Sequence, residues 1–353
     1  MANSSATRLL FQAGVSSDSA TGRIRVLTRY LEGAIRFGAK AKMMDTGSKN
    51  QIKGYLSVVV ASIMWASSGT AGKALFQAGM TPFELVQIRV TLSTAILAAL
   101  LAAFSKGFPR IKIKDLGTFL VLGAAFMAMV QGTYFFAISK IQVAAAILLQ
   151  DLAVVLVAIF SVCFWKERLT PSKLIALILA LCGCYMAVGG YNLNMIRMNR
   201  MGIMGGLASA LCLAGYTLVG EGALHRYTPA TILFYALAFS TLTWHIIYPP
   251  FHYITAGFTP SQWAGILYIA VVGTIIPFGL FFTGINYIRS TRAIITATLE
   301  PISGGLMAFF LLGEILEALQ VIGGVLVIGA IVLLQIKREQ DEMTPELLRA
   351  RGK

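Results

Sequence analysis

The feature that most constrains this chain is a series of ten apolar runs that recur from Tyr55 to Ile336. Each run can cross a hydrocarbon core of about 30 Å as an α-helix, which needs roughly 20 mostly apolar residues. A membrane β-strand needs only about 10 alternating residues, and lipid offers the backbone no partners outside its own helix. The sequence therefore predicts an all-α polytopic membrane protein with ten transmembrane helices, at approximately 55–74, 82–104, 115–138, 141–163, 171–190, 202–222, 229–249, 260–284, 291–312 and 317–336.

The distribution of charge predicts how these helices are oriented. Only 12% of residues are charged, well below the usual share in a soluble protein, but the net charge is +14. If the N-terminus is cytoplasmic, most lysines and arginines fall in cytoplasmic segments, which is the positive-inside pattern. We therefore expect both termini in the cytoplasm, a bacterial cytoplasmic (inner) membrane as the location, and no nucleic-acid partner.

Residues 1–50 differ in kind from the rest because they are rich in serine and arginine. We interpret them as a basic N-terminal cytoplasmic extension, for which three explanations stay open. It is a dispensable extension or a mistaken start ahead of Met43, a helix that lies on anionic lipid, or a transit peptide. The second explanation depends on one apolar helical face opposite an arginine face, formed respectively by Ile24, Leu27, Leu31 and Ile35 and by Arg25, Arg29 and Arg36.

The chain also repeats itself at an offset of 147 residues. Because each copy contains five spans, an odd number, the second copy enters the membrane in the opposite direction. Such inverted repeats are typical of secondary transporters, whose substrate site lies near the midplane between the copies. The expected organisation is repeat 1 at 51–190, repeat 2 at 201–337 and a cytoplasmic tail at 338–353. The pairs that set the register include Pro82 with Pro229, Ser93-Thr94 with Ser240-Thr241, Gly132 with Gly279, Leu152 with Leu299, and Glu167 with Glu314.

The closing segments of the two copies carry a family resemblance. "AILLQDLAVVLVAIFSVCFWKERLTPSKLIALILALCG" and "AIITATLEPISGGLMAFFLLGEILEALQVIGGVLVIGA" resemble the closing signature of the EamA domain in the drug/metabolite transporter superfamily. The second copy matches at Glu300-Pro301, Gly313-Glu314 and Gly323-Gly324, and Trp65 in "SIMWASSG" is similar to the family's first-helix Trp. The first copy departs, with Ala153-Val154 in place of Glu-Pro and Lys166 before Glu167. The resemblance implies a ten-helix permease for small metabolites and names no substrate.

Two carboxyl side chains lie near the predicted midplane, Asp151 in span 4 and Glu300 in span 9. A carboxylate at the centre of a membrane helix costs about 2.5–3.5 kcal/mol on insertion scales. Each of the two is therefore expected to have a polar or charged partner, to face a water-filled cavity, or to be protonated. Pro301 leaves the carbonyl of Ala297 without its usual partner and is expected to kink the helix. Glu300 is thus a candidate for proton coupling or substrate binding, or else makes a structural hydrogen bond at the kink. Asp151 is weighed in the same way.

Other polar and aromatic positions are weaker candidates. Arg89 and Glu84 are interpreted as a structural pair near the outer end of span 2, and Glu167 and Glu314 as stabilising or hinge residues at helix ends. Gly202 and Gly206 form a GxxxG that indicates close helix packing. Aromatic and amide residues expected to share a substrate cavity, if they do not serve packing or interface roles, are Trp65, Gln131, Tyr134, Tyr216 and Asn286.

The function expected from these observations is secondary transport by alternating access, with export as the expected direction and the proton as a possible coupling ion. A membrane enzyme is the competing class, but the chain has no GxSxG, HExxH or Walker A motif and no CxxC or other metal-ligand cluster, so we expect no enzyme activity, cofactor or metal. A channel lacks an evident filter. A nucleotide-sugar or sugar-phosphate antiporter is the alternative transporter, yet the deep charged residues, Asp151 and Glu300, favour a zwitterionic, cationic or neutral solute such as an amino acid or amine. No feature identifies the substrate or the oligomeric state.

Overall fold

The computed structural model describes residues 20–104, 109–141, 143–165, 170–187, 200–249, 257–312, 318–336, 344–346 and 349. The chain divides into two units, residues 1–50 and 51–353, and all the expected spans lie in the second. Glu167 and Glu314 lie outside the described residues, so the roles expected for them stay predictions. The three explanations of residues 1–50 also stay open.

The first repeat consists of five spans, two of which are divided into shorter helices. Span 1 is the last part of α2, and span 3 contains a π-helical segment. The elements are α2 (Ala20–Gln77), α3 (Pro82–Phe104), η1 (Ile113–Asp115), α4 (Leu116–Leu120), the π-helix η2 (Val121–Met127), α5 (Ala128–Lys140), α6 (Val143–Asp151), α7 (Ala153–Trp165) and α8 (Pro171–Ala187).

The second repeat follows the same plan, including a π-helical segment in its third span. Span 8 runs from α12 into the first part of α13, and span 9 runs from the last part of α13 into α14. The elements are α9 (Arg200–Leu224), α10 (Pro229–Ile247), α12 (Pro260–Ala270), the π-helix η4 (Val271–Ile275), α13 (Ile276–Ala297), α14 (Leu299–Leu312) and α15 (Ala318–Ile336).

Some of these helices can be recognised as membrane-spanning from their length and composition alone. Five helical stretches within the described residues are long and apolar enough to cross a bilayer, and three shorter apolar helices accompany them. The shorter ones belong to spans 4, 5 and 10. Within the described residues the chain is an all-α membrane protein whose helices follow the ten expected spans, in two inverted five-helix repeats as the sequence predicted.

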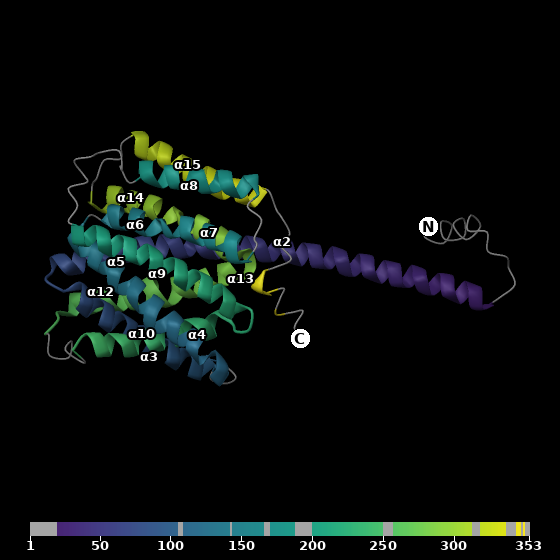
Figure 1. Cartoon of the computed structure of the whole chain (residues 1–353), viewed down its shortest axis with the longest axis horizontal. Helices are drawn as coiled ribbons and strands as arrows, with labels where there is room; N and C mark the ends of the chain where they lie inside the picture. The colour runs from purple at the N-terminus through teal and green to yellow at the C-terminus, as the bar shows by residue number, and fades with distance from the viewer. Residues whose placement is uncertain are drawn as a thin grey trace. The chain divides into compact units, whose positions relative to one another are not determined.

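Contacts between equivalent residues follow the repeat. The Thr94 and Thr241 hydroxyl oxygens lie 2.8 Å apart, and the two residues are separated in sequence by the repeat offset of 147. The equivalent helices α8 and α15 also lie side by side (Figure 1). A residue can contact its own equivalent only near the axis that relates two copies, so α3 with α10, and α8 with α15, lie along that axis.

Spans 4 and 9 are interrupted within one residue of equivalent places. α6 ends at Asp151 and α7 begins at Ala153, while α13 ends at Ala297 and α14 begins at Leu299. In span 9 the interruption at Thr298 lies just before Pro301, which has no N–H to donate to the Ala297 carbonyl. Span 4 is interrupted at Leu152 although it contains no proline there. Broken helices at membrane depth are tolerated where they line a cavity or are buried in protein.

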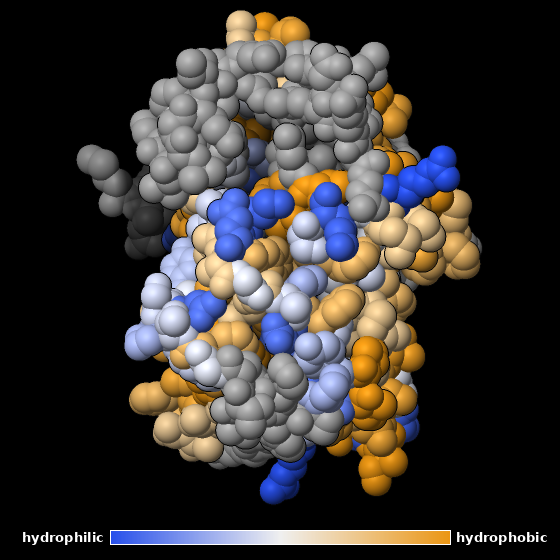
Figure 2. Space-filling model, turned by 90° about the vertical axis from the view of Figure 1, so that its left-hand side faces the viewer, coloured by the Kyte–Doolittle hydropathy of each residue, from blue (hydrophilic) through white to orange (hydrophobic). Residues whose placement is uncertain are grey.

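The outer surface and the ends of the bundle differ in polarity. Large apolar side chains are exposed along the helices, as expected of a surface that faces lipid, among them Leu56, Ile159, Ile178, Leu211, Leu242 and Val325. Figure 2 shows one end of the molecule, where hydrophilic residues gather across the middle of the face and hydrophobic residues lie at its margins. This distribution fits helix ends that meet water inside a lipid-facing rim.

Candidate functional site

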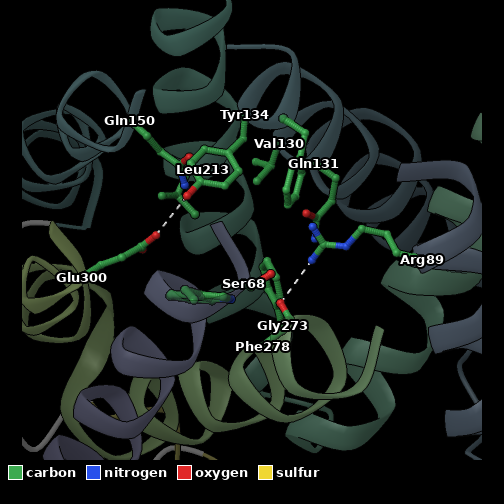
Figure 3. Close-up of a pocket in the computed structure, with 12 residues that line it drawn as sticks. Ser68, Arg89, Val130, Gln131, Tyr134, Gln150, Leu213, Gly273, Phe278 and Glu300 are labelled. Atoms are coloured by element: carbon green, nitrogen blue, oxygen red, sulfur yellow. Dashed lines mark hydrogen bonds between the residues drawn. The ribbon is translucent and has the colours of Figure 1, made fainter. Parts of the chain in front are cut away.

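A small cavity lies between the two repeats (Figure 3). It offers about 30 Å³ to the centre of a water-sized sphere, enough for roughly two water molecules. The site is therefore contracted, and a metabolite needs it to widen. Repeat 1 contributes Trp65, Ser68, Arg89, Val130, Gln131, Tyr134, Phe135 and Gln150, and repeat 2 contributes Leu213, Gly273, Phe278 and Glu300.

Glu300 forms the acidic side of the cavity. It lies in the first turn of α14, directly after the interruption of span 9, and is 7% exposed. The Tyr134 hydroxyl on α5 donates a hydrogen bond to its Oε1 over 3.3 Å. This bond joins the two repeats across the cavity, so the state of the Glu300 carboxyl bears directly on how they meet.

Asp151 lies behind this side of the cavity. It is 8% exposed and ends α6, and it interacts electrostatically with Glu300 and Tyr134. Its neighbour Gln150 lines the cavity and accepts a hydrogen bond from the Ser209 hydroxyl over 3.0 Å. The two interrupted helices thus bring both intramembrane carboxyls to the same region from opposite repeats.

An aromatic wall faces the carboxyl. The Trp65 ring lies 4.9 Å from Phe278 and 5.2 Å from Phe281, measured between centroids. Its indole Nε1 is buried and has no hydrogen-bond partner within the described part of the chain. A buried donor without a partner is costly, so a ligand that accepts from Nε1 would be favoured here.

Arg89 forms the basic side of the cavity and corrects the interpretation made from sequence. It is 2% exposed, and its guanidinium donates to the Thr274 hydroxyl from Nε (3.1 Å) and Nη2 (2.6 Å), and to the Gly273 carbonyl from Nη2 (3.1 Å). It also lies 4.7 Å from the Phe135 ring centroid. The expected pair with Glu84 is wrong: Glu84 caps its own helix by accepting from the Thr81 N–H and hydroxyl.

Glycine is required at position 273, where Arg89 binds the backbone carbonyl. A Cβ at this position would lie 2.2 Å from the Ser68 hydroxyl oxygen and 2.6 Å from its Cβ, closer than real Cβ contacts. The residue lies in the π-helix η4, and such segments occur frequently at functional sites. Its missing side chain lets α2 approach the carbonyl that holds the arginine.

The residues predicted from sequence fall into two groups. Glu300, Trp65, Gln131 and Tyr134 line the cavity, whereas Asp151, Tyr216 and Asn286 do not. Tyr216 is buried and packs on Phe278 and Phe282, 5.7 and 5.1 Å between centroids, which places it behind the wall. Asn286 accepts a hydrogen bond from Arg349 of the C-terminal tail over 3.0 Å. Their roles in substrate binding or coupling, like those of the lining residues, remain predictions.

Several lining residues were not predicted. Arg89 was visible as a charge about a third of the way along span 2, and Gln150 as a polar neighbour of Asp151. Nothing in the sequence pattern distinguishes the others from packing residues; they are Ser68, Val130, Phe135, Leu213, Gly273 and Phe278. Among the residues whose placement is described, no group of His, Cys, Asp and Glu could hold a metal ion.

The sequence matches the EamA-like transporter family over residues 52–189 and 200–336, one match for each repeat. The chain belongs to this family. It is therefore an integral membrane transporter, and the resemblance inferred from its closing motifs is confirmed.

Individual relatives agree with this assignment. The chain is 26% identical to the uncharacterized inner membrane transporter YicL of Salmonella typhimurium, over 80% of this chain and 95% of that protein. It is 31% identical to an uncharacterized transporter of Archaeoglobus fulgidus, over 60% of this chain and 73% of that protein. A solved crystal structure, at 18% identity, superposes with a TM-score of 0.63 over 82% of this chain and 97% of the other, which shows a shared fold.

Proposed function

We propose that this protein is a secondary transporter that exports a small zwitterionic, cationic or neutral solute, such as an amino acid or amine, by alternating access and with proton coupling. The observation that carries the proposal is Glu300, a buried carboxyl at the interruption of span 9 that lines the cavity and accepts from Tyr134 of the other repeat. A second candidate, sugar-phosphate antiport, is favoured by one observation, the basic Arg89 in the same cavity.

The mechanism follows from how a carboxyl responds to water. A buried carboxyl favours the neutral form, and the carboxylate is favoured when water enters. If the two repeats rock about the cavity, Glu300 meets water from one side at a time and can take up or release its proton accordingly. Its bond to Tyr134 joins the two repeats across the contracted cavity, so a change in its charge state would act on the contact between them.

The test uses the purified protein in liposomes. Glu300→Gln keeps the shape and an acceptor for Tyr134 but fixes the neutral form. We expect it to abolish accumulation driven by a pH gradient while exchange between two loaded sides continues. Tyr134→Phe is the matched control, because it removes the bond to Glu300 and leaves the titratable group. Accumulation by the Glu300→Gln protein under a pH gradient would show that Glu300 is not the proton carrier.

We propose the orientation from the distribution of charge along the chain. The protein lies in a bacterial inner membrane, and both termini face the cytoplasm. A cysteine placed at Asn192, in the segment that joins the repeats, is expected to react with a membrane-impermeant thiol reagent added from outside the cell. Reaction only from the cytoplasm would reverse the orientation.

A further inference from the structure

We propose that Arg89 binds the carboxylate of a zwitterionic, amino-acid-like substrate, and that this residue sets the selectivity for the anionic group. The inference rests on the proposed transport function and narrows its substrate class. It concerns a residue that the sequence pattern assigned to a structural pair.

Arg89 forms no ion pair with any residue that the structure describes. It is 2% exposed, and no carboxylate within the described ranges lies at ion-pair distance from it. It donates hydrogen bonds to one hydroxyl and one carbonyl. Within the described residues, the two N–H groups of Nη1 donate no hydrogen bond. Burying a charge without an opposite charge is costly, so an anion that enters the cavity gains a strong interaction.

The fold itself does not require an arginine at this position. By the repeat offset, Ala236 on α10 is the equivalent of Arg89 on α3. α10 packs on the π-helix η2 as α3 packs on the π-helix η4. There a Cβ on Gly123 would lie 2.5 Å from the Phe239 Cβ and 2.7 Å from the Ala236 carbonyl oxygen, so α10 and η2 pack closely at Ala236. The second copy therefore packs α10 on η2 with alanine at the position equivalent to Arg89.

Further donors converge on the same space. The buried Trp65 Nε1 has no partner among the residues described, and the Ser68 hydroxyl lies beside the Gly273 backbone that holds Arg89. Figure 3 shows the Arg89 guanidinium and Ser68 directed toward the same part of the cavity. A carboxylate has two acceptor oxygens, and the planar guanidinium matches that geometry.

The acidic side of the cavity favours a zwitterion over a multiply charged anion. Glu300 and the nearby Asp151 lie on the opposite side, and the described residues give Glu300 no ion pair. A phosphate ester would bring two negative charges toward two carboxyls and meet only one arginine. An ammonium group near Glu300 and a carboxylate on Arg89 would instead satisfy both sides of the cavity, while Trp65 and Phe278 would contact an apolar side chain.

The experiment measures ligand-induced thermal stabilisation and calorimetric affinity on the full-length protein. The probes are matched triplets, L-leucine with L-leucinamide and isopentylamine, and L-phenylalanine with L-phenylalaninamide and phenethylamine. We expect the wild type to bind an amino acid at least about tenfold more tightly than its amide or amine, as charge-assisted hydrogen bonds to a buried cation predict. In Arg89→Gln this ratio should fall to about 1 while amide binding persists, and Arg89→Lys should give an intermediate ratio.

The matched control is Arg226→Gln, which removes an arginine whose side chain is 63% exposed, pairs with Asp115 and does not line the cavity. It should keep the wild-type ratio. Equal loss of all three members of a triplet in Arg89→Gln would show a structural arginine and overturn the proposal. So would absence of amino-acid binding, or tighter binding of glucose 6-phosphate or inorganic phosphate. Amino-acid counterflow in liposomes that is insensitive to Arg89→Gln would retain the transporter and remove only this inference.

Discussion

In each repeat a turn precedes the interrupted span, and side chains of opposite charge stabilise the two turns. The span 3–4 turn is at Ile141, where the Lys73 ammonium donates to the Ile138 and Ile141 carbonyls over 2.8 and 3.2 Å. The span 8–9 turn is at Arg289, where the Glu221 carboxylate accepts from Arg289 Nε over 3.0 Å and from the Ser290 N–H over 2.8 Å. In repeat 1 a cation from span 1 binds carbonyls at the C-terminus of a helix, and in repeat 2 an anion from span 6 binds an N–H at the N-terminus of a helix. In each case the charge is the one that the helix dipole favours at that end.

The two turns also differ in burial and in backbone strain. Glu221 is fully buried and Arg289 is 6% exposed, with φ at 67°, whereas Lys73 is only partly buried. Breaking a buried ion pair leaves a charge without compensation, but a half-exposed ammonium can return to water. We therefore expect the span 8–9 turn to be the more rigid of the two and the Lys73 side to open more readily.

The largest effect should come from Glu221→Ala. It leaves Arg289 and the Ser290 N–H without their shared acceptor and should lower the free energy of unfolding by about 3–5 kcal/mol. Denaturant unfolding of the purified protein in detergent measures this. Glu84→Ala, which removes an exposed helix cap, is the control and should cost about 1 kcal/mol. Equal costs for the two variants would mean that the buried pair is not a principal support.

The next effect concerns the strained backbone at Arg289. Arg289→Ala and Arg289→Gly both remove the ion pair, but only glycine adopts a positive φ without steric cost. We expect the glycine variant to be the more stable by about 1 kcal/mol in the same unfolding assay. If alanine is as stable as glycine, the left-handed conformation is not retained in the variants, and the turn is less rigid than proposed.

A smaller effect is expected at the other turn. Lys73→Met keeps the apolar stem and removes two hydrogen bonds to carbonyls that can be solvated, so it should cost about 1 kcal/mol or less. Its more sensitive readout is accessibility, because a cysteine placed at Ile141 should be labelled faster in the Lys73→Met protein. An unfolding cost equal to that of Glu221→Ala would remove the difference between the two turns.

The smallest effect should be the coupling between Thr94 and Thr241, which the repeat axis brings together. A double-mutant cycle with Thr94→Val and Thr241→Val should give a coupling of about 0.5 kcal/mol, typical of a neutral hydrogen bond in which each hydroxyl keeps a backbone acceptor. Because this contact relates the repeats symmetrically, it provides the baseline for the asymmetric turns. A coupling of several kcal/mol would indicate that the axis, not the turns, holds the repeats together.

Much of the architecture could be predicted because lipid restricts the options. Apolar runs of about 20 residues must be helices, and an odd number of spans per copy makes the copies inverted. Glu300 could be selected as a site candidate because a carboxyl is conspicuous in an apolar run. The break at Thr298, close to Pro301, lies one residue from the position equivalent to Leu152, where span 4 is interrupted without a proline.

The sequence by itself determined which segments cross the membrane, how the copies relate and where buried charge occurs, because these follow from hydrophobicity along the chain. Only the tertiary structure decided which partners the buried charged and polar side chains have. Arg89 turns inward onto Gly273 and Thr274, and Asn286 is held by Arg349 of the tail, because helices distant in sequence supply those partners. The direction of a side chain depends on helix rotation and on neighbours that pack against it, and neither is encoded in the spacing of residues within one span.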